Sequence, residues 1–210
     1  MTTKLALYNS ALLIAAERKL SSLTEEREPR RMLDQVWDDG AVKFCLEQGQ
    51  WAFATRAVKL DYDAASTITF GLQRQFTIPS DHVRTVAFSS DEYFTTRAQY
   101  TVERNSWFSE LDIIYVRYVS NDTSYGNDLT LWPETFSEYV AAHLCSRIIH
   151  RLTADTKERD RVYKLSNMRH EDAKAKDAIG KDVVFMPKGS WVMSKRGRRS
   201  YRDSSGNWSV

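Results

Sequence analysis

The hydrophobic pattern of this 210-residue chain changes its period twice, so the chain cannot consist of one type of secondary structure alone. Apolar residues recur at helical spacing over residues 4–20 and 29–48, alternate with polar residues between 50 and 119, and return to helical spacing over 133–179. Helical segments that enclose several strand-length segments are typical of an α+β chain. The sequence therefore predicts a helical part, built from both ends of this pattern, with a small antiparallel β domain inserted into it.

Four helices are expected in the helical part. The first covers residues 4–20, and the second starts near Pro29 and stops near Gln48, because proline favours a first helical turn and Gly49 favours a helix end. The third starts at Pro133 and continues through residue 152. The fourth runs from about residue 155 to 179, with a stripe spaced near 3.5 residues: Val162, Leu165, Met168, Asp172, Ala175 and Ile179.

These patterns divide the chain into four segments. Residues 1–50 and 130–180 are the two halves of a four-helix-type bundle, and residues 51–129 are the β insertion, whose longest strand candidate covers 111–119. Residues 181–210 show no sustained period and are expected to form an extended arm. The predicted fold class is α+β: a four-helix-type bundle, an inserted antiparallel β domain and a C-terminal arm.

Charge separates the arm from the rest of the chain. Residues 181–210 hold seven basic and two acidic residues, a net charge of +5, whereas the remaining 180 residues have a net charge of −3. Aromatic anchors combined with arginines favour docking on a partner protein; a disordered basic tail and direct contact with DNA are the alternatives. The candidate docking residues are Phe185, Trp191, Lys195, Arg196, Arg198, Arg199 and Tyr201.

The cysteines and the first segment indicate an intracellular protein. Cys45 and Cys145 lie in apolar, helix-like surroundings, which predicts two buried free thiols rather than one disulfide. The N-terminal apolar stretch is interrupted by Asn9 and Ser10 and is too short to cross a bilayer. It leads into charged residues and not into a signal-peptide cleavage site.

No motif in the sequence predicts catalysis or metal binding. The patterns HExxH, CxxC, GxxxxGK[ST], GxGxxG and GxSxG do not occur. His143, Cys145 and His150 fall on the third predicted helix and His170 on the fourth, where packing at a helix interface is a better interpretation than a zinc site. We therefore expect no cofactor, no metal and no enzyme activity, with a catalytic triad assembled from distant residues as the alternative.

Four arginines are candidates for contacts between subunits. Arg147 and Arg151 lie within the apolar stripe of the third helix, where a long side chain can extend past the edge of the core to water. The alternative is ion pairing between copies in an oligomer. Arg159 and Arg161 belong to the mixed-sign surface of the fourth helix, which indicates a solvated face or, in an assembly, an interface.

Three segments carry a family resemblance. They are VWDDGAVKFCLEQGQWAFATRAVKL, FTIPSDHVRTV and LWPETFSEYVAAHLCSRIIHRLT. They contain Trp51-x-Phe53-Ala54 after a helix, Pro79-x-Asp81 at the start of a strand, and Pro133-x-x-Phe136 at the start of a long helix. With these motifs in this order and spacing, roughly residues 1–180 resemble the tail tubular protein A family, the head-to-tail adaptors of short-tailed bacteriophages.

The resemblance implies a structural virion protein in the phage neck, assembled in the host cytoplasm. Family members form a ring of twelve copies beneath the portal protein, and their β insertion meets the nozzle, tail tubular protein B. Genomic DNA passes through the channel without sequence-specific binding, and no membrane, cofactor or catalytic residue is involved. A body charge of −3 agrees with a conduit that does not retain DNA, since each neutralised phosphate adds affinity.

For the arm, we expect residues 183–203 to insert into or wrap the portal, with Trp191 as the anchor. An extended segment orders only when it docks, which suits assembly in sequence. Three alternatives stay open: another neck or tail-completion protein such as a six-fold tail terminator, a DNA-binding protein with a basic arm, and a polysaccharide-degrading tail enzyme.

Overall fold

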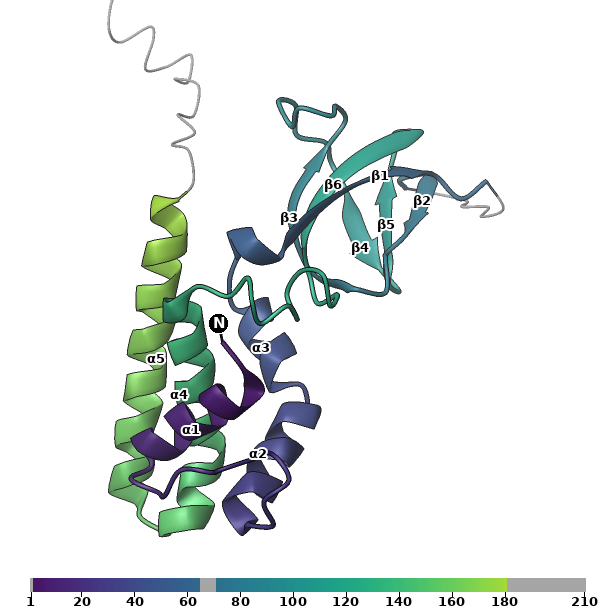
Figure 1. The fold of residues 1–210 in the computed structure, drawn as a ribbon. Coiled ribbons are helices and arrows are strands. Elements are labelled where there is room, and N and C mark those ends of the chain that lie inside the picture. The colour runs from purple at the N-terminus through teal and green to yellow at the C-terminus, as the bar shows by residue number, and fades with distance from the viewer. Residues whose placement is uncertain (1, 65–70, 181–210) are drawn as a thin grey trace, which may run out of the picture. The chain divides into compact units, whose positions relative to one another are not determined.

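A computed structural model describes residues 2–64 and 71–180 (Figure 1). Within these residues the chain has five α-helices and two three-stranded antiparallel sheets, in the order helices, strands, helices. The predicted α+β class is confirmed. The predicted arm, with its seven candidate docking residues, lies outside the described residues.

The first helix, α1, covers Lys4–Ile14 and is shorter than predicted. It starts where the Thr3 hydroxyl accepts a hydrogen bond from the amide of Ala6, and the chain turns away at Ala16, whose φ of 57° is left-handed. The side chain of Asn9 then holds the loop that follows, because it bonds both the N–H (2.7 Å) and the C=O (3.2 Å) of Leu20. Leu20 is buried as a result.

The expected single helix over residues 29–48 is wrong. The chain forms two helices, α2 (Glu28–Asp38) and α3 (Ala41–Glu47). Gly40 separates them with a φ of 92°, a left-handed conformation that glycine adopts at little cost. A sequence pattern with helical spacing on both sides of a glycine hides this break, because each short helix keeps the same apolar face.

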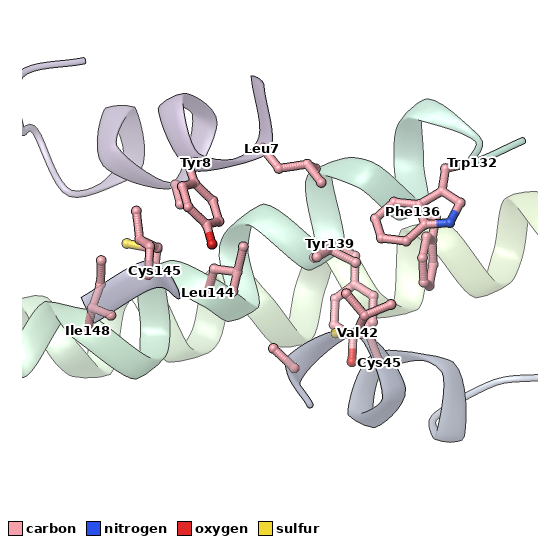
Figure 2. Close-up of a cluster of buried hydrophobic side chains, with 14 of the residues drawn as sticks. Leu7, Tyr8, Val42, Cys45, Trp132, Phe136, Tyr139, Leu144, Cys145 and Ile148 are labelled. Carbon is pink, nitrogen blue, oxygen red and sulfur yellow. The ribbon is translucent and has the colours of Figure 1, made fainter. Parts of the chain in front are cut away.

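Helix α4 (Glu134–Thr153) is the centre of the helical part. It packs against α1, α2, α3 and α5, and Figure 2 shows side chains of α1 and α3 meeting those of α4. The single predicted stripe therefore describes only part of its buried surface. Its buried residues are Phe136, Ser137, Tyr139, Val140, Ala141, Ala142, Leu144, Cys145, Ile148 and Ile149.

Helix α5 (Thr156–Ile179) starts at Asp155, whose carboxylate caps the amide of Lys157. Of its 24 described residues, Val162, Ser166 and Ala173 are buried. Of the stripe spaced near 3.5 residues, Val162 is buried, whereas Met168 is 55% exposed and Ile179 is 78% exposed, so the stripe does not mark the face that α5 buries within the chain. The buried positions follow the period of a straight helix, near 3.6, and two of them are small, which lets α5 lie close to α4.

Six strands form the β region, preceded by a short 3-10 turn, Ala52–Ala54. One sheet has the order β1-β6-β3 (Thr55–Asp61, Ile113–Ser120, His82–Ser89), and the other the order β2-β5-β4 (Arg74–Thr77, Ser106–Ser109, Thr101–Glu103). All pairings are antiparallel. Strand β5 was not predicted, because four residues with serine at both ends give no clear alternation.

Two separate hydrophobic clusters result, and strand β6 contributes to both. Ile114, Val116 and Tyr118 join Phe76 and Trp107 from the second sheet in the β cluster. Val119, which points to the opposite side of the strand, belongs to the helical cluster. The two faces of β6 therefore serve two different cores.

Candidate interaction surfaces

Two of the three motifs behind the family resemblance meet in one aromatic cluster. Ring centroids of Trp51 and Phe53 each lie 4.8 Å from that of Phe136, and that of Trp132 lies 4.9 Å from it. Trp51 also donates from Nε1 to the carbonyl of Cys45 at 3.1 Å. The cluster fastens the turn between α3 and β1 to the first turns of α4.

Gly49, expected to end the second helix, has a further reason to be glycine. A Cβ atom at this position would lie 2.7 Å from the indole ring of Trp51, closer than such contacts occur. Trp51 is 1% exposed and has no room to move away. The residue therefore makes space for the aromatic cluster.

The third motif holds the base of the β region through Asp81. Its carboxylate accepts hydrogen bonds from Arg56 Nη1 at 2.9 Å, Tyr118 Oη at 3.0 Å and Ser120 Oγ at 2.6 Å. Burial raises the pKa of Asp81, but the hydrogen bonds from Ser120, Arg56 and Tyr118 outweigh it, so the net pKa is lowered. In turn, burial and the Asp81 carboxylate raise the pKa of Tyr118 to about 12.

This arrangement ties three strands together. Arg56 lies on β1, Tyr118 and Ser120 lie on β6, and Asp81 immediately precedes β3. The polar groups of this network, which we call the Asp81 clamp, are hydrogen-bonded within it, so their role is to hold the strands together. The sequence singled out Asp81 within its motif, but nothing in the local pattern identified Arg56, Tyr118 or Ser120 as its partners.

The histidines divide between interfaces and surface. His143 is half-buried and stacks on Phe44 at 4.7 Å, and burial, followed by the charge of Arg147, lowers its pKa to about 4. His170 packs on Tyr139 at 4.9 Å. Packing at a helix interface is thus confirmed for these two residues and wrong for His150, which is exposed.

Both cysteines are free and buried, as predicted. Burial raises the pKa of Cys45 and of Cys145 to about 12, which leaves both as neutral thiols. Among residues 2–64 and 71–180, no group of three or more His, Cys, Asp or Glu side chains could hold a metal ion. No helix in the same residues is long and apolar enough to cross a membrane.

The four candidate interface arginines do not form one site. Arg151 of α4 pairs with Glu28 of α2 at 3.6 Å, while Arg159 and Arg161 of α5 pair with Asp160 and Glu158 on the same helix. Arg161 also donates to the carbonyl of Ile14 at 3.2 Å. Such exposed pairs contribute about 0–1 kcal/mol each. Arg147 is exposed, as a side chain that extends past the core would be. A role for these arginines between subunits stays a prediction.

A second exposed surface lies along α5. Lys157, Lys164, Met168, Ala175 and Ile179 are all exposed, and at 100° per residue they fall within an arc of about 60°. This α5 face, as we call these five residues, points away from the buried positions of the helix. Of the other members of the predicted stripe, Leu165 is half-buried beside this face and Asp172 is exposed at its edge.

Another surface lies where α2 ends and α3 begins. Asp38 and Asp39 are exposed there, and Phe44 follows with 46% of its surface exposed. A pocket beside them is lined by Val36, Asp39, Gly40, Ala41, Phe44, His143 and Arg147. We call Asp38, Asp39 and Phe44 the α2–α3 flank.

No model of a known protein family matches the sequence, and no match was found among curated proteins. The likeness of the three motifs to the tail tubular protein A family therefore stays a prediction.

Proposed function

We propose that the protein is a structural ring subunit, the head-to-tail adaptor that joins the portal of a short-tailed phage to the tail nozzle. In this role it forms part of the channel through which DNA leaves the capsid, and it has no enzymatic activity. The observation that carries the proposal is the state of α5. This 24-residue helix is attached through one narrow face, while Tyr163, Met168 and Ile179 are 62%, 55% and 78% exposed.

Such a helix is unusual in a protein that functions as a monomer. A helix with few buried residues gains little stability from tertiary packing, and exposed apolar side chains on its outer face, Met168 and Ile179, favour contact with another surface. Charges of both signs accompany them, which suits complementary contacts between neighbouring copies. Repeated around an axis, contacts between two different surfaces close into a ring.

The two hydrophobic clusters support a division of tasks. The helical part, with α4 at its centre, would form the body of the ring and correspond to the helical bundle of an adaptor. The β insertion has its own core and its own polar clamp at Asp81, so it can present a stable surface to the next tail component. The motifs that carry the family resemblance, Trp51, Asp81 and Phe136, hold these two parts in shape.

The arm is assigned to the portal on its sequence. Its +5 charge and its aromatic residues would bind acidic groups and apolar pockets of a completed portal ring, with Trp191 as the anchor. DNA would pass the ring without being held. No bond is made or broken in this function, so every residue acts through binding and positioning.

The experiment is to mix the purified chain with portal rings and to image the particles. We expect twelve copies bound to one portal, and removal of residues 181–210 should abolish binding in a pull-down. Trp191→Ala is a narrower test of the same contact, because it keeps the charge of the arm and removes only the proposed anchor. This variant should clearly weaken binding to the portal.

Several results would contradict the proposal. Unchanged portal binding after removal of 181–210 would overturn the role of the arm. A six-fold ring at the end of a tail would indicate a terminator, and tight, salt-sensitive binding of short duplexes by the chain alone would indicate a DNA-binding protein.

A further inference from the structure

Helix α4 separates two surfaces of the helical part. Glu138 of α4 pairs with Arg169 of α5 at 2.8 Å, whereas His143 of α4 stacks on Phe44 of α3 at 4.7 Å. Glu138 and His143 are five residues apart, which turns them about 140° around the helix axis. The α5 face and the α2–α3 flank therefore lie on different sides of α4, where one copy of the chain does not bring them together.

The α5 face changes character along its length. Its first half carries Lys157 and Lys164, neither of which forms an ion pair with any described residue. Its second half carries Met168, Ala175 and Ile179. Asp172 lies at the edge of this face and is the acidic group nearest to it among the unpaired ones. Along the chain, the face offers positive charge first and apolar surface afterwards.

The α2–α3 flank has the complementary character. Asp38 and Asp39 have no ion-pair partner in the described part of the chain, and they lie between the C-terminal end of α2 and the N-terminal end of α3, whose dipoles act on their charge in opposite senses. Incoming cations would give these two exposed carboxylates the ion-pair partners that they lack. Phe44 follows them, held in place by its stack on His143.

Two cations lie near this flank and reduce its charge. Lys43 is exposed on α3, and Arg147 of α4 lines the same pocket as Asp39 and Phe44. The exposed Glu47 adds a third carboxylate and Arg84, which donates to the Glu47 carbonyl at 3.2 Å, adds a third cation, so the pairing depends on the local position of Asp38 and Asp39 and not on a net charge of the surface. The α5 helix, in contrast, has Lys157, Lys164 and Lys176 against Asp172 among its charges without a described ion pair.

We propose that the α5 face of one copy packs on the α2–α3 flank of the next copy. Lys157 and Lys164 meet Asp38 and Asp39, while Met168 packs against Phe44, a sulfur–aromatic contact of a common kind. The two surfaces differ, so the contact runs head to tail and repeats from copy to copy. The inference rests on the proposed function, because it names the surfaces through which ring subunits touch.

Charge reversal tests the pairing. The first variant is Lys157→Glu with Lys164→Glu, and the second is Asp38→Lys with Asp39→Lys. Each places like charges across the contact and should lower assembly at least tenfold, measured as ring mass by native mass spectrometry with portal present. An equimolar mixture should assemble again, with the variants alternating, because each junction then joins opposite charges. Lys59→Glu with Arg97→Glu is the matched control in the β insertion and should assemble normally.

Cross-linking gives an independent readout. Lys164→Cys and Asp39→Cys in one chain should form disulfides between copies. The native cysteines should not compete, because both are buried. Mild oxidation should produce a ladder of covalent multimers, and neither single variant should extend beyond dimers. Circular dichroism and thermal unfolding of each charge variant should match the parent chain, which separates loss of contact from loss of fold.

The outcomes distinguish this inference from the proposed function. If the parent chain forms rings but both charge variants also do, or if the mixture is not rescued and no ladder forms, the pairing is overturned and the ring stands. If the parent chain forms no ring with or without portal, the proposed function fails, and the pairing fails with it.

Discussion

Helices α4 and α5 are neighbours in sequence and similar in length, yet they relate to the rest of the molecule in opposite ways. Ten residues of α4 are buried and face every side of the helix, whereas three residues of α5 are buried and share one side. Both have helical spacing of apolar residues. The difference is that α4 has described neighbours all round, while α5 has α4 alone as its main support.

The comparison teaches that an apolar stripe does not by itself identify the face a helix buries within its own chain. In α4 several positions outside the stripe, such as Ala141, Ala142 and Ile149, are small or apolar, so neighbours can pack on them too. In α5 they are charged, and the small residues Ser166 and Ala173 decide which side approaches α4. The stripe that remains outside is available to another molecule.

The largest effect should come from the first turn of α4. Phe136→Ala should lower the free energy of unfolding by about 3–5 kcal/mol, because it removes the ring on which Trp51, Phe53 and Trp132 pack. Chemical denaturation measures the change. Tyr163→Ala on α5, at a position 62% exposed, is the matched control and should change stability by less than about 0.5 kcal/mol. Equal losses in the two variants would erase the contrast between the helices.

A smaller effect is expected where α5 touches α4. Val162→Ala removes two methyl groups from a buried contact and should lower stability by about 2 kcal/mol. Hydrogen exchange should show faster exchange of α5 amides than of α4 amides, because α5 has few other contacts. Uniform acceleration across both helices would mean that α5 is as firmly integrated as α4.

The half-buried edge of α4 gives a pH dependence. The pKa of His143 is about 4 in the folded chain, below its ordinary value near 6.5, because of burial and then Arg147. Between these values the unfolded chain binds more protons, so the contribution of His143 to stability should fall as pH drops from 6.5 to 4 and change no further below that range. Since the ring remains partly in water, we expect a loss of about 1–2 kcal/mol.

His143→Phe isolates this contribution, because it keeps an aromatic ring against Phe44 and has no titrating group. Asp39 and Arg147, which line the same pocket, stay in both proteins. The unfolding free energy of the variant should therefore depend less on pH across this range than that of the parent. Identical pH profiles would show that folding does not lower the pKa of His143.

The smallest effect on folding should come from the α5 face. Met168→Ala changes a side chain that is 55% exposed and should alter the unfolding free energy by less than about 0.5 kcal/mol. The same variant should weaken assembly with portal, since it removes the proposed contact with Phe44. A loss of stability above 1 kcal/mol would place Met168 in the core of its own chain.

Sequence periodicity predicted the element types well where the periodic segment was long. The α+β class and α4 followed from it, and the limits of α5 were right to within a residue because Asp155 is a capping residue and Gly180 follows the helix. The break at Gly40 and the early end of α1 at Ala16 were missed, because both depend on single left-handed residues within an uninterrupted apolar pattern.

The candidate surfaces were less accessible to prediction. The spacing of the α5 stripe did not show which side of the helix is buried, since the choice between two sides depends on the shape of α4. The Asp81 clamp joins residues separated by as many as 39 positions, a distance over which a single sequence carries no signal. Arg147 and Arg151 were expected to extend past the edge of the core to water, and their exposure agrees with this.

Strand β6 has a mechanical consequence. Tyr118 and Val119 are adjacent in the chain, yet one is buried in the β cluster and the other in the helical cluster. A force applied to the β insertion along this strand would act on both clusters at once, because no residue separates Tyr118 from Val119. We therefore expect the two halves to melt in a single cooperative step, and a push received by the strands to be felt at the base of the helices.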